Sequence, residues 1–222
     1  METSVKNMAE NVVWRNFRNG DSNALAQIFR EQYDSLYYYG TKLTRDEDLV
    51  KDCIQNVFLK LWSRRDQLGE IRYVKAYLLK TLQRHISDEA VASGKKKNLQ
   101  TDLVYEFDIT FSHEDFLIAA QISKEQGEAL ARFLNQLSKR QREALFLKFY
   151  EGLDYEKIAD VMALNVQSVR NLIHQSLKSL KEHKAELMPP SSSALRPVLD
   201  SACFDGKYAS PLALLIAYFF AA

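Results

Sequence analysis

The stretch LDYEKIADVMALNVQSVRNLIHQSLKSL, residues 153–180, decides the fold of the C-terminal half of the chain. Residues 155–162 predict a short helix capped by Asp154, because apolar side chains recur there at helical spacing. The tripeptide Ala-Leu-Asn at 163–165 predicts a turn, and Asn165 is suited to capping a second helix. Two short helices joined by so brief a turn have the pattern of a helix-turn-helix unit.

The second helix of this stretch has one apolar and one polar face. Its apolar face holds Val166, Val169, Ile173, Leu177 and Leu180. Its polar face holds the candidate DNA-reading residues Gln167, Ser168, Arg170, Asn171, His174, Gln175 and Lys178. Asn and Gln pair with adenine and Arg with guanine in the major groove, so this face suits a recognition helix. Since any amphipathic helix has a polar face, two ordinary core helices remain the alternative.

The rest of the chain predicts an all-α protein of two small helical domains. Only 7 Gly and 4 Pro occur in 222 residues, which leaves few turn signals for a strand-rich fold. The expected organisation is an N-terminal extension (1–20), a first domain (21–94), a linker (95–128), a second domain (129–187) and a linker with an apolar tail (188–222). Helical spacing in the first domain predicts three helices, near residues 23–43, 45–65 and 72–91.

Three further features of these segments are local. The first helix has an apolar face of Leu25, Ile28, Phe29, Leu36 and Tyr39, and the second has an unusually wide apolar face. In the linker, Phe107, Ile109 and Phe111 alternate with other residues and predict a short extended piece. Ser138 suits the cap of a helix in the second domain.

Charge is segregated along the chain, although the formal net charge is only +1. Residues 60–97 contain ten Lys and Arg against four acids, and residues 102–128 contain seven acids and one Lys. A basic block followed by an acidic one predicts either two solvated faces or a polyanion-binding domain followed by a segment that avoids or imitates polyanion.

Other sequence features limit the cellular context and the chemistry. The chain has two cysteines, Cys53 and Cys203, in unlike sequence contexts; this pattern indicates neither a metal quartet nor a disulfide framework and fits a reduced cytoplasm. The N-terminus has no secretory signal pattern, and the apolar run PLALLIAYFFAA at 211–222 is shorter than a bilayer span. No nucleophile, metal or phosphate-loop pattern is present, so we expect no enzyme activity and no cofactor.

The second domain resembles region four of bacterial extracytoplasmic-function (ECF) sigma factors. The resemblance rests on RQREALFLKFYEGLDYEKIADVM from Arg140 and on SVRNLIHQSLKSL from Ser168. It implies that the helix from Val166 reads the minus-thirty-five promoter element. Family members often carry several arginines there, whereas this chain has Leu172 and Gln175 at such places. Fewer basic residues predict weak autonomous recognition with a shallow salt dependence.

The first domain independently resembles region two of the same family. Its stretch DCIQNVFLKLW, residues 52–62, is similar to the helix that docks on the clamp helices of the polymerase beta-prime subunit. The resemblance gives these candidate contacts: Asp52, Gln55, Asn56, Phe58, Lys60 and Trp62. The following helix is similar to the part that opens and reads the minus-ten element, where melted bases stack on aromatic side chains. Its candidate contacts are Tyr73, Lys75, Tyr77, Lys80, Gln83, Arg84 and Ser87.

The family resemblance implies a promoter-specificity subunit of the RNA polymerase core, with contacts to the beta-prime clamp helices, the beta subunit flap and promoter DNA. The stretch FDITFSHEDFLI at 107–118 also resembles linkers of members from Bacteroidetes. An anti-sigma factor or a recruiting protein is a further expected partner, and we expect the apolar tail to dock on protein rather than on a membrane surface. A stand-alone repressor or activator is the alternative, but it leaves the region-two resemblance unexplained.

Overall fold

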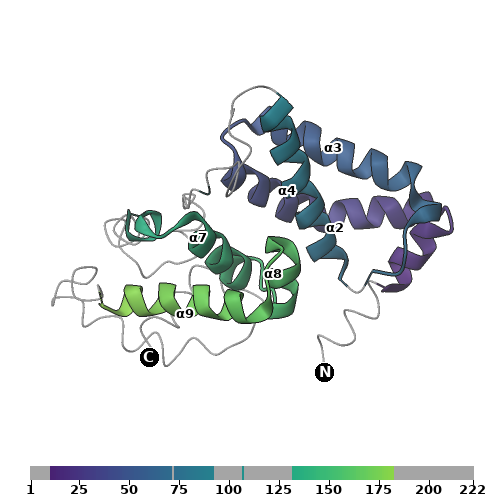
Figure 1. Cartoon of the computed structure of the whole chain (residues 1–222). Coiled ribbons are helices and arrows are strands. Elements are labelled where there is room, and N and C mark those ends of the chain that lie inside the picture. Colours follow the sequence, from purple (N-terminus) through teal and green to yellow (C-terminus); the bar gives the residue numbers. More distant parts are fainter. Residues whose placement is uncertain (1–10, 72, 93–106, 108–131, 183–222) are drawn as a thin grey trace, which may run out of the picture. The chain divides into compact units, whose positions relative to one another are not determined.

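The structure is a computed structural model that describes residues 11–71, 73–92, 107 and 132–182. Every regular element within these residues is helical, which confirms the predicted all-α class (Figure 1). The chain divides into two compact units, described separately below. The predicted domain boundaries near residues 94, 128 and 187 lie outside the described residues, as do Cys203 and the apolar tail.

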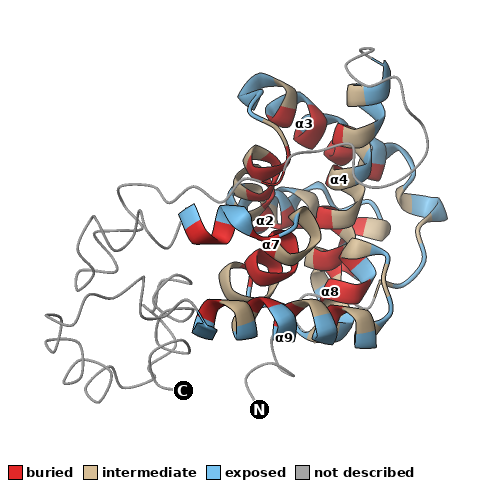
Figure 2. Cartoon of the chain, turned by 60° about the vertical axis from the view of Figure 1, so that its left-hand side comes forward, coloured by how far each residue is buried: buried red, intermediate tan, exposed pale blue. Residues whose placement is uncertain are grey.

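The first unit contains α2 (Ser22–Leu43), α3 (Glu47–Ser63), the 3-10 turn η1 (Arg65–Gln67) and α4 (Val74–Ala92). The three long helices occur where helical spacing predicted them. Asp21 caps α2, because its Oδ1 accepts a hydrogen bond from the Asn23 backbone N–H at 2.8 Å. The helices bury one face each against their neighbours (Figure 2).

The core of the first unit differs from the predicted one on α2. Ile28, Leu36 and Tyr39 are buried as expected, but Leu25 is only half-buried and Phe29 is 39% exposed. A helical segment at residues 11–18 adds Trp14 and Phe17 to this core, where both side chains are buried. The first unit therefore buries aromatic side chains from outside its three long helices.

The second unit contains α7 (Lys139–Leu145), the π-helical turn η2 (Phe146–Tyr150), the start of α8 (Tyr155–Met162) and α9 (Val166–Glu182). Ser138 caps α7 as predicted, and Gln141 completes a capping box by accepting from the Ser138 backbone N–H at 3.0 Å. The last turn widens into η2, which helical spacing did not predict. Gly152 then ends this segment with a φ of +65°, a conformation that favours glycine.

The core of the second unit forms between α7, η2, α8 and α9. Leu145, Leu147, Ile158 and Ile173 are among its buried side chains. Phe107 reaches this core from far along the sequence and packs edge-on against Phe146, with ring centroids 5.4 Å apart. The predicted alternation of Phe107 with Ile109 and Phe111 otherwise lies outside the described residues.

Candidate nucleic-acid interface and apolar groove

The pair α8 and α9 has the short turn of a helix-turn-helix unit. The Leu164 backbone N–H donates to the Ala159 carbonyl at 2.9 Å, which closes the end of α8. Ala163 adopts a φ of +53° in the turn. Asn165 then caps α9 as predicted, because its Oδ1 accepts from the Ser168 backbone N–H at 2.7 Å. These contacts fix the direction in which α9 leaves the turn.

Asp154 directly precedes α8, at the position predicted for its cap. Asp154 was expected to cap this helix, and its carboxylate Oδ2 lies 3.4 Å from Lys157 Nζ one turn later. The Ile158 backbone N–H donates to the Asp154 carbonyl at 3.0 Å, so the backbone of Asp154 begins the helix ladder. Asp154 therefore contributes an ion pair and a backbone acceptor to the start of α8.

One face of α9 is buried and holds the helix in its unit. Val169, Ile173 and Leu180 are buried as predicted, while Val166 and Leu177 are only half-buried. Ser176 is fully buried, and its hydroxyl donates to the Leu172 carbonyl one turn earlier at 2.7 Å. The hydrogen bond to the preceding turn satisfies this buried hydroxyl within α9 itself.

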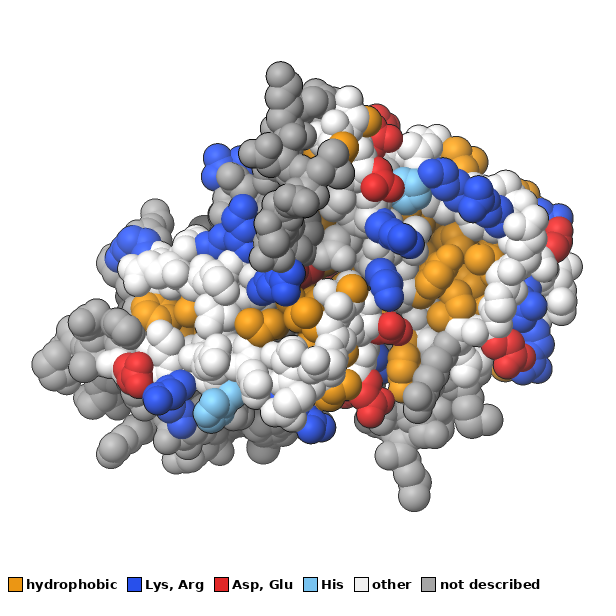
Figure 3. All heavy atoms as spheres, in the orientation of Figure 1, with side chains coloured by type: hydrophobic (Ala, Val, Ile, Leu, Met, Phe, Trp, Pro, Cys, Tyr) orange, Lys and Arg blue, Asp and Glu red, His pale blue; other side chains and the backbone are white. Residues whose placement is uncertain are grey.

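The opposite face of α9 presents the predicted DNA-reading residues to solvent. Six of the seven are exposed and Ser168 is half-buried. Gln167 Nε2 donates to Asn171 Oδ1 at 3.0 Å, and Lys178 pairs with Glu182 at 3.9 Å. The surface over α9 is mainly uncharged (Figure 3). The shortage of basic residues noted in the sequence is therefore also a property of the folded surface.

The predicted minus-ten residues lie on α4 and just before it. Spacings of four and three residues place five of them on one helix face: Tyr73, Tyr77, Lys80, Arg84 and Ser87. Lys75 and Gln83 fall outside this face. Arg84 is exposed and the other described candidates are half-buried. Figure 3 shows basic side chains beside an apolar patch on the surface of this unit.

Tyr77 also has a structural role in the first unit. Its ring meets the Trp14 ring edge-on, with centroids 6.0 Å apart, and its carbonyl accepts from the Thr81 hydroxyl at 2.7 Å. The Trp14 indole N–H donates to the Gly69 carbonyl at 3.3 Å, in the connection between α3 and α4. The half-buried ring of Tyr77 therefore packs on Trp14, and its exposed part is compatible with the predicted base contact.

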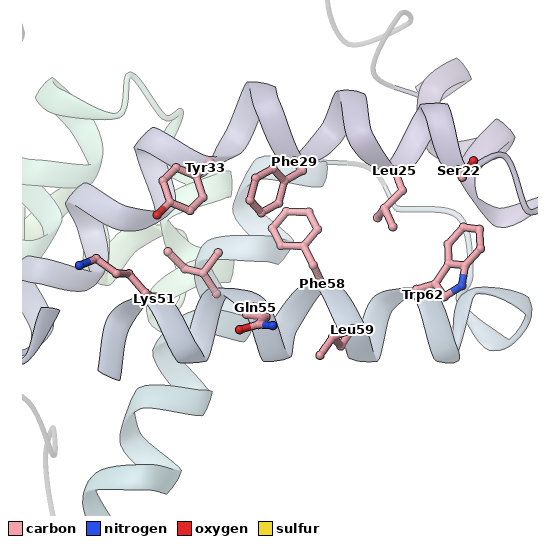
Figure 4. Close-up of a pocket in the computed structure, with 10 residues that line it drawn as sticks. Ser22, Leu25, Phe29, Tyr33, Lys51, Gln55, Phe58, Leu59 and Trp62 are labelled. Atoms are coloured by element: carbon pink, nitrogen blue, oxygen red, sulfur yellow. The ribbon is translucent and has the colours of Figure 1, made fainter. Parts of the chain in front are cut away.

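An apolar groove runs between α2 and α3 (Figure 4), with a volume of about 490 Å³. Phe29 of α2 and Phe58 of α3 point toward each other across it, with ring centroids 4.9 Å apart. Leu59, which also lines the groove, is 59% exposed. The full lining is Ser22, Leu25, Phe29, Tyr33, Lys51, Ile54, Gln55, Phe58, Leu59 and Trp62.

Three of the six predicted polymerase contacts line this groove, namely Gln55, Phe58 and Trp62. The other three are exposed elsewhere on α3 and do not line it: Asp52, Asn56 and Lys60. The sequence did not predict the α2 side of the groove. Helical spacing placed Leu25 and Phe29 on one apolar face with the core residues of α2, and it did not show that they line a groove. The signal was the wide apolar face of the α3 sequence, which exceeds what one neighbouring helix can cover.

Trp62 is held at the end of the groove by its neighbours. Arg65 lies over its ring at 4.6 Å and donates from Nη1 to the Trp62 carbonyl at 2.9 Å. Phe17 packs against the same ring, with centroids 6.4 Å apart. The end of α3 is therefore fixed by contacts from both η1 and the helix at residues 11–18.

Two groups in the first unit have perturbed pKa values. Burial raises the pKa of the Cys53 thiol to about 11, so this cysteine is protonated at neutral pH. Burial and the nearby Lys60 ammonium lower the pKa of His85, whose Nε2 lies 3.3 Å from Lys60 Nζ. A neutral His85 can accept a hydrogen bond from Lys60, which a protonated imidazole could not.

Across the described part of the chain, no helix combines the length and apolar character that a membrane span requires. Among the same residues, no three His, Cys, Asp or Glu side chains gather closely enough to hold a metal ion.

Comparisons with known proteins show similarity to one family. Residues 127–180 match the family model described as sigma-70, region 4. The ECF RNA polymerase sigma factor SigK of Mycobacterium sp. strain JLS is 21% identical over 170 residues, covering 77% of this chain and 88% of the relative. SigK of Mycolicibacterium vanbaalenii is 24% identical over 171 residues, covering 73% of this chain and 82% of the relative.

A solved structure supports the fold across both units. The chain resembles CnrH, solved in complex with the cytosolic domain of CnrY, with a TM-score of 0.53 at 18% identity. The match covers 80% of this chain and 98% of CnrH. The likeness to Bacteroidetes members stays a prediction. Residues 127–180 thus match region 4 of the sigma-70 family, and the chain as a whole is similar to RNA polymerase sigma factors of the extracytoplasmic-function type.

Proposed function

We propose that the two units divide the work of promoter recognition, with the first holding the polymerase and opening DNA and the second placing α9 on duplex DNA. The domains carrying these roles are residues 21–94 and 129–187. In this proposal the protein acts in the cytoplasm by binding polymerase and DNA, and it catalyses no reaction of its own. The observation that carries the proposal is the α2–α3 groove, because an exposed apolar surface of this kind marks a protein-binding site.

The groove is proposed to receive the beta-prime clamp helices of core polymerase. The apolar side chains available for contact along the groove are Leu25, Phe29 and Leu59. Phe58 and Trp62 also line the groove. A helix docking in an apolar groove buries a row of side chains at helical spacing. Asp52, Asn56 and Lys60 lie beside this row on α3, where they would add polar contacts at the rim.

The α4 face is proposed to hold the melted minus-ten strand. Tyr73 and Tyr77 offer rings for base stacking, while Lys80 and Arg84 on the same face offer positive charge to the backbone. Lys75, Gln83 and Ser87 complete the proposed contacts. Because Tyr77 also packs on Trp14, we expect its ring to be only partly available to a base.

The α9 face is proposed to read the minus-thirty-five element with low affinity. Its readers are Gln167, Ser168, Arg170, Asn171, His174, Gln175 and Lys178. The ion pair of Lys178 with Glu182 and the mainly uncharged surface support weak phosphate binding. Promoter choice then depends on the first unit or on a recruiting protein. The beta flap and an anti-sigma factor are further proposed partners, and the apolar tail is proposed to dock on protein.

Run-off transcription with purified core polymerase tests this division of labour. Core polymerase supplemented with the full chain should start transcripts at discrete sites on genomic fragments. An alternative protein class, the stand-alone repressor or activator, would bind duplex fragments without polymerase and start no transcripts. Nanomolar binding of the full chain alone to a promoter duplex would contradict the weak reading assigned to α9.

A further inference from the structure

Two cationic side chains lie beside the ring of Tyr155, at the start of α8. The Arg170 guanidinium carbon is 5.6 Å from the ring centroid, and Lys148 Nζ is 4.6 Å from it. Both distances fall within the ~6 Å over which a cation is attracted to the face of an aromatic ring. The three residues come from η2, α8 and α9, so the ring is a point where three elements of the second unit meet.

The backbone around Tyr155 is fixed, whereas Arg170 is a long exposed side chain. Lys148 Nζ lies 3.5 Å from the Leu153 carbonyl, and Asp154 pairs with Lys157 at 3.4 Å. These contacts tie the residues just before and after Tyr155, whose ring is half-buried. An exposed arginine otherwise samples many rotamers, and ordering it on binding weakens affinity. The ring therefore restricts Arg170 before DNA arrives.

We propose that Tyr155 is a positioning residue that directs Arg170 toward one base of the duplex, which rests on the function proposed for α9. Arginine distinguishes guanine by a planar, bidentate pair with O6 and N7, and this pairing depends on the direction of the guanidinium. Because the exposed face of α9 carries few basic residues, Arg170 supplies much of the base discrimination that this helix can give.

The test compares base discrimination by the full chain bound to core polymerase. A promoter fragment is varied through all four base pairs at each position of its upstream element, and competition binding measures the preference. The R170A variant identifies the position that Arg170 reads. Y155F keeps the ring face and should retain the wild-type preference at that position. Y155L removes the ring face and should lower the preference there by roughly fivefold.

Two variants separate positioning from a structural role. Tyr150 is a matched control, because it is a half-buried tyrosine of the same unit that stacks on Phe146 at 4.8 Å. Y150L should leave the preference unchanged. Y155M places a flexible, unbranched side chain without a ring face at this position, and it replaces Y155L if hydrogen exchange shows that Y155L unfolds α8. Loss of preference in Y155M with retention in Y155F would support positioning by the ring.

The outcomes distinguish this inference from the proposed function. An unchanged preference in Y155L and Y155M, together with a lost preference in R170A, overturns the positioning role alone. Equal weakening at all four base pairs in Y155L also overturns it, because Tyr155 would then contact the DNA backbone or only support the fold. No change in R170A overturns both the inference and base reading by Arg170.

Discussion

Gly40 lies where α2 and α3 come closest. A Cβ at this position would meet Val50 Cγ1 at 2.5 Å, and the branched Val50 side chain has little freedom to move away. Alanine normally favours a helix over glycine by about 1 kcal/mol, but overpacking of a core costs about 1 to 3 kcal/mol. We expect Gly40→Ala to destabilise the first unit by about 1 to 2 kcal/mol.

Tryptophan fluorescence during urea unfolding measures this effect, because both tryptophans of the chain, Trp14 and Trp62, lie in the first unit. Gly69→Ala is the control, since an added Cβ there has no neighbour within 4 Å. The control should unfold at nearly the wild-type midpoint. A Gly40→Ala variant as stable as the control would contradict the close packing of α2 and α3.

Ala163 occupies the turn between α8 and α9 with a left-handed φ of +53°. This conformation costs an L-residue about 1 to 2 kcal/mol, while glycine adopts it freely. The residue is exposed, so its methyl group adds little packing. We expect Ala163→Gly to stabilise the helix-turn-helix by about 0.5 to 1 kcal/mol, after the greater unfolded-state entropy of glycine is subtracted.

Hydrogen exchange of the α8 and α9 amides measures the effect of Ala163→Gly within these two helices. Ala26→Gly is the matched control, because Ala26 is exposed within α2, about one turn from its start. Glycine at position 26 should destabilise α2 by about 1 kcal/mol, whereas glycine at position 163 should be stabilising. Faster exchange in α8 and α9 of the Ala163→Gly variant would show that the turn does not carry the strain its φ indicates.

His85 predicts a loss of stability on mild acidification. Its pKa is lowered from the ordinary value of 6.5, first by burial and then by Lys60. The unfolded chain therefore binds a proton more readily than the folded chain, and stability falls as pH drops below 6.5 toward the lowered value. Asp88 and Glu89 act in the opposite direction but do not cancel the shift.

Urea unfolding of the first unit at several pH values between about 8 and 5.5 checks this dependence, in a range where His titrates and most carboxylates stay ionised. His85→Gln keeps a polar side chain without a titrating ring. Its unfolding midpoint should change less over this range than that of the wild type. If the unfolding midpoints of the two proteins change equally with pH, His85 does not contribute to the acid sensitivity.

At the scale of elements, the helix-turn-helix was the most predictable part of the chain. Apolar spacing predicted α8 at residues 155–162, and the structure has the same bounds. Asn165 and Ser138 cap their helices as expected, because a side-chain acceptor beside unpaired N–H groups is a local signal. Such features depend on a few neighbouring residues, so the sequence alone is sufficient to find them.

Other elements depend on contacts that sequence spacing does not contain. Phe29 belongs to the apolar face of α2, yet it lies in an exposed groove rather than in the core. Helical spacing identifies an apolar face without showing whether the same domain covers it. The π-helical turn at 146–150 adds one residue to a turn, with the Glu151 N–H donating to the Phe146 carbonyl at 3.1 Å. An apolar run such as FLKFY does not distinguish this turn from an α-helix.

At the scale of the whole molecule, we expect both proposed interfaces to depend only weakly on salt. The groove is mainly apolar, so polymerase binding through it should change little with ionic strength. DNA binding by α9 depends on few cations, so its affinity should also fall with a shallow slope as salt increases. Titrations of the full chain with promoter duplex at several salt concentrations measure that slope. A steep slope would indicate phosphate contacts beyond those proposed for α9.

The affinity of the full chain for core polymerase tests the central claim most directly. Leu59→Glu places a charge in the groove. Because the Leu59 side chain is 59% exposed, its replacement should leave the fold intact. Val91→Glu is the matched control, because Val91 is 41% exposed on α4 and does not line the groove. We expect Leu59→Glu to weaken binding at least tenfold, since a buried unpaired charge costs more than about 1.4 kcal/mol. Val91→Glu should bind like the wild type. Unchanged binding by Leu59→Glu would contradict the assignment of the α2–α3 groove to the polymerase.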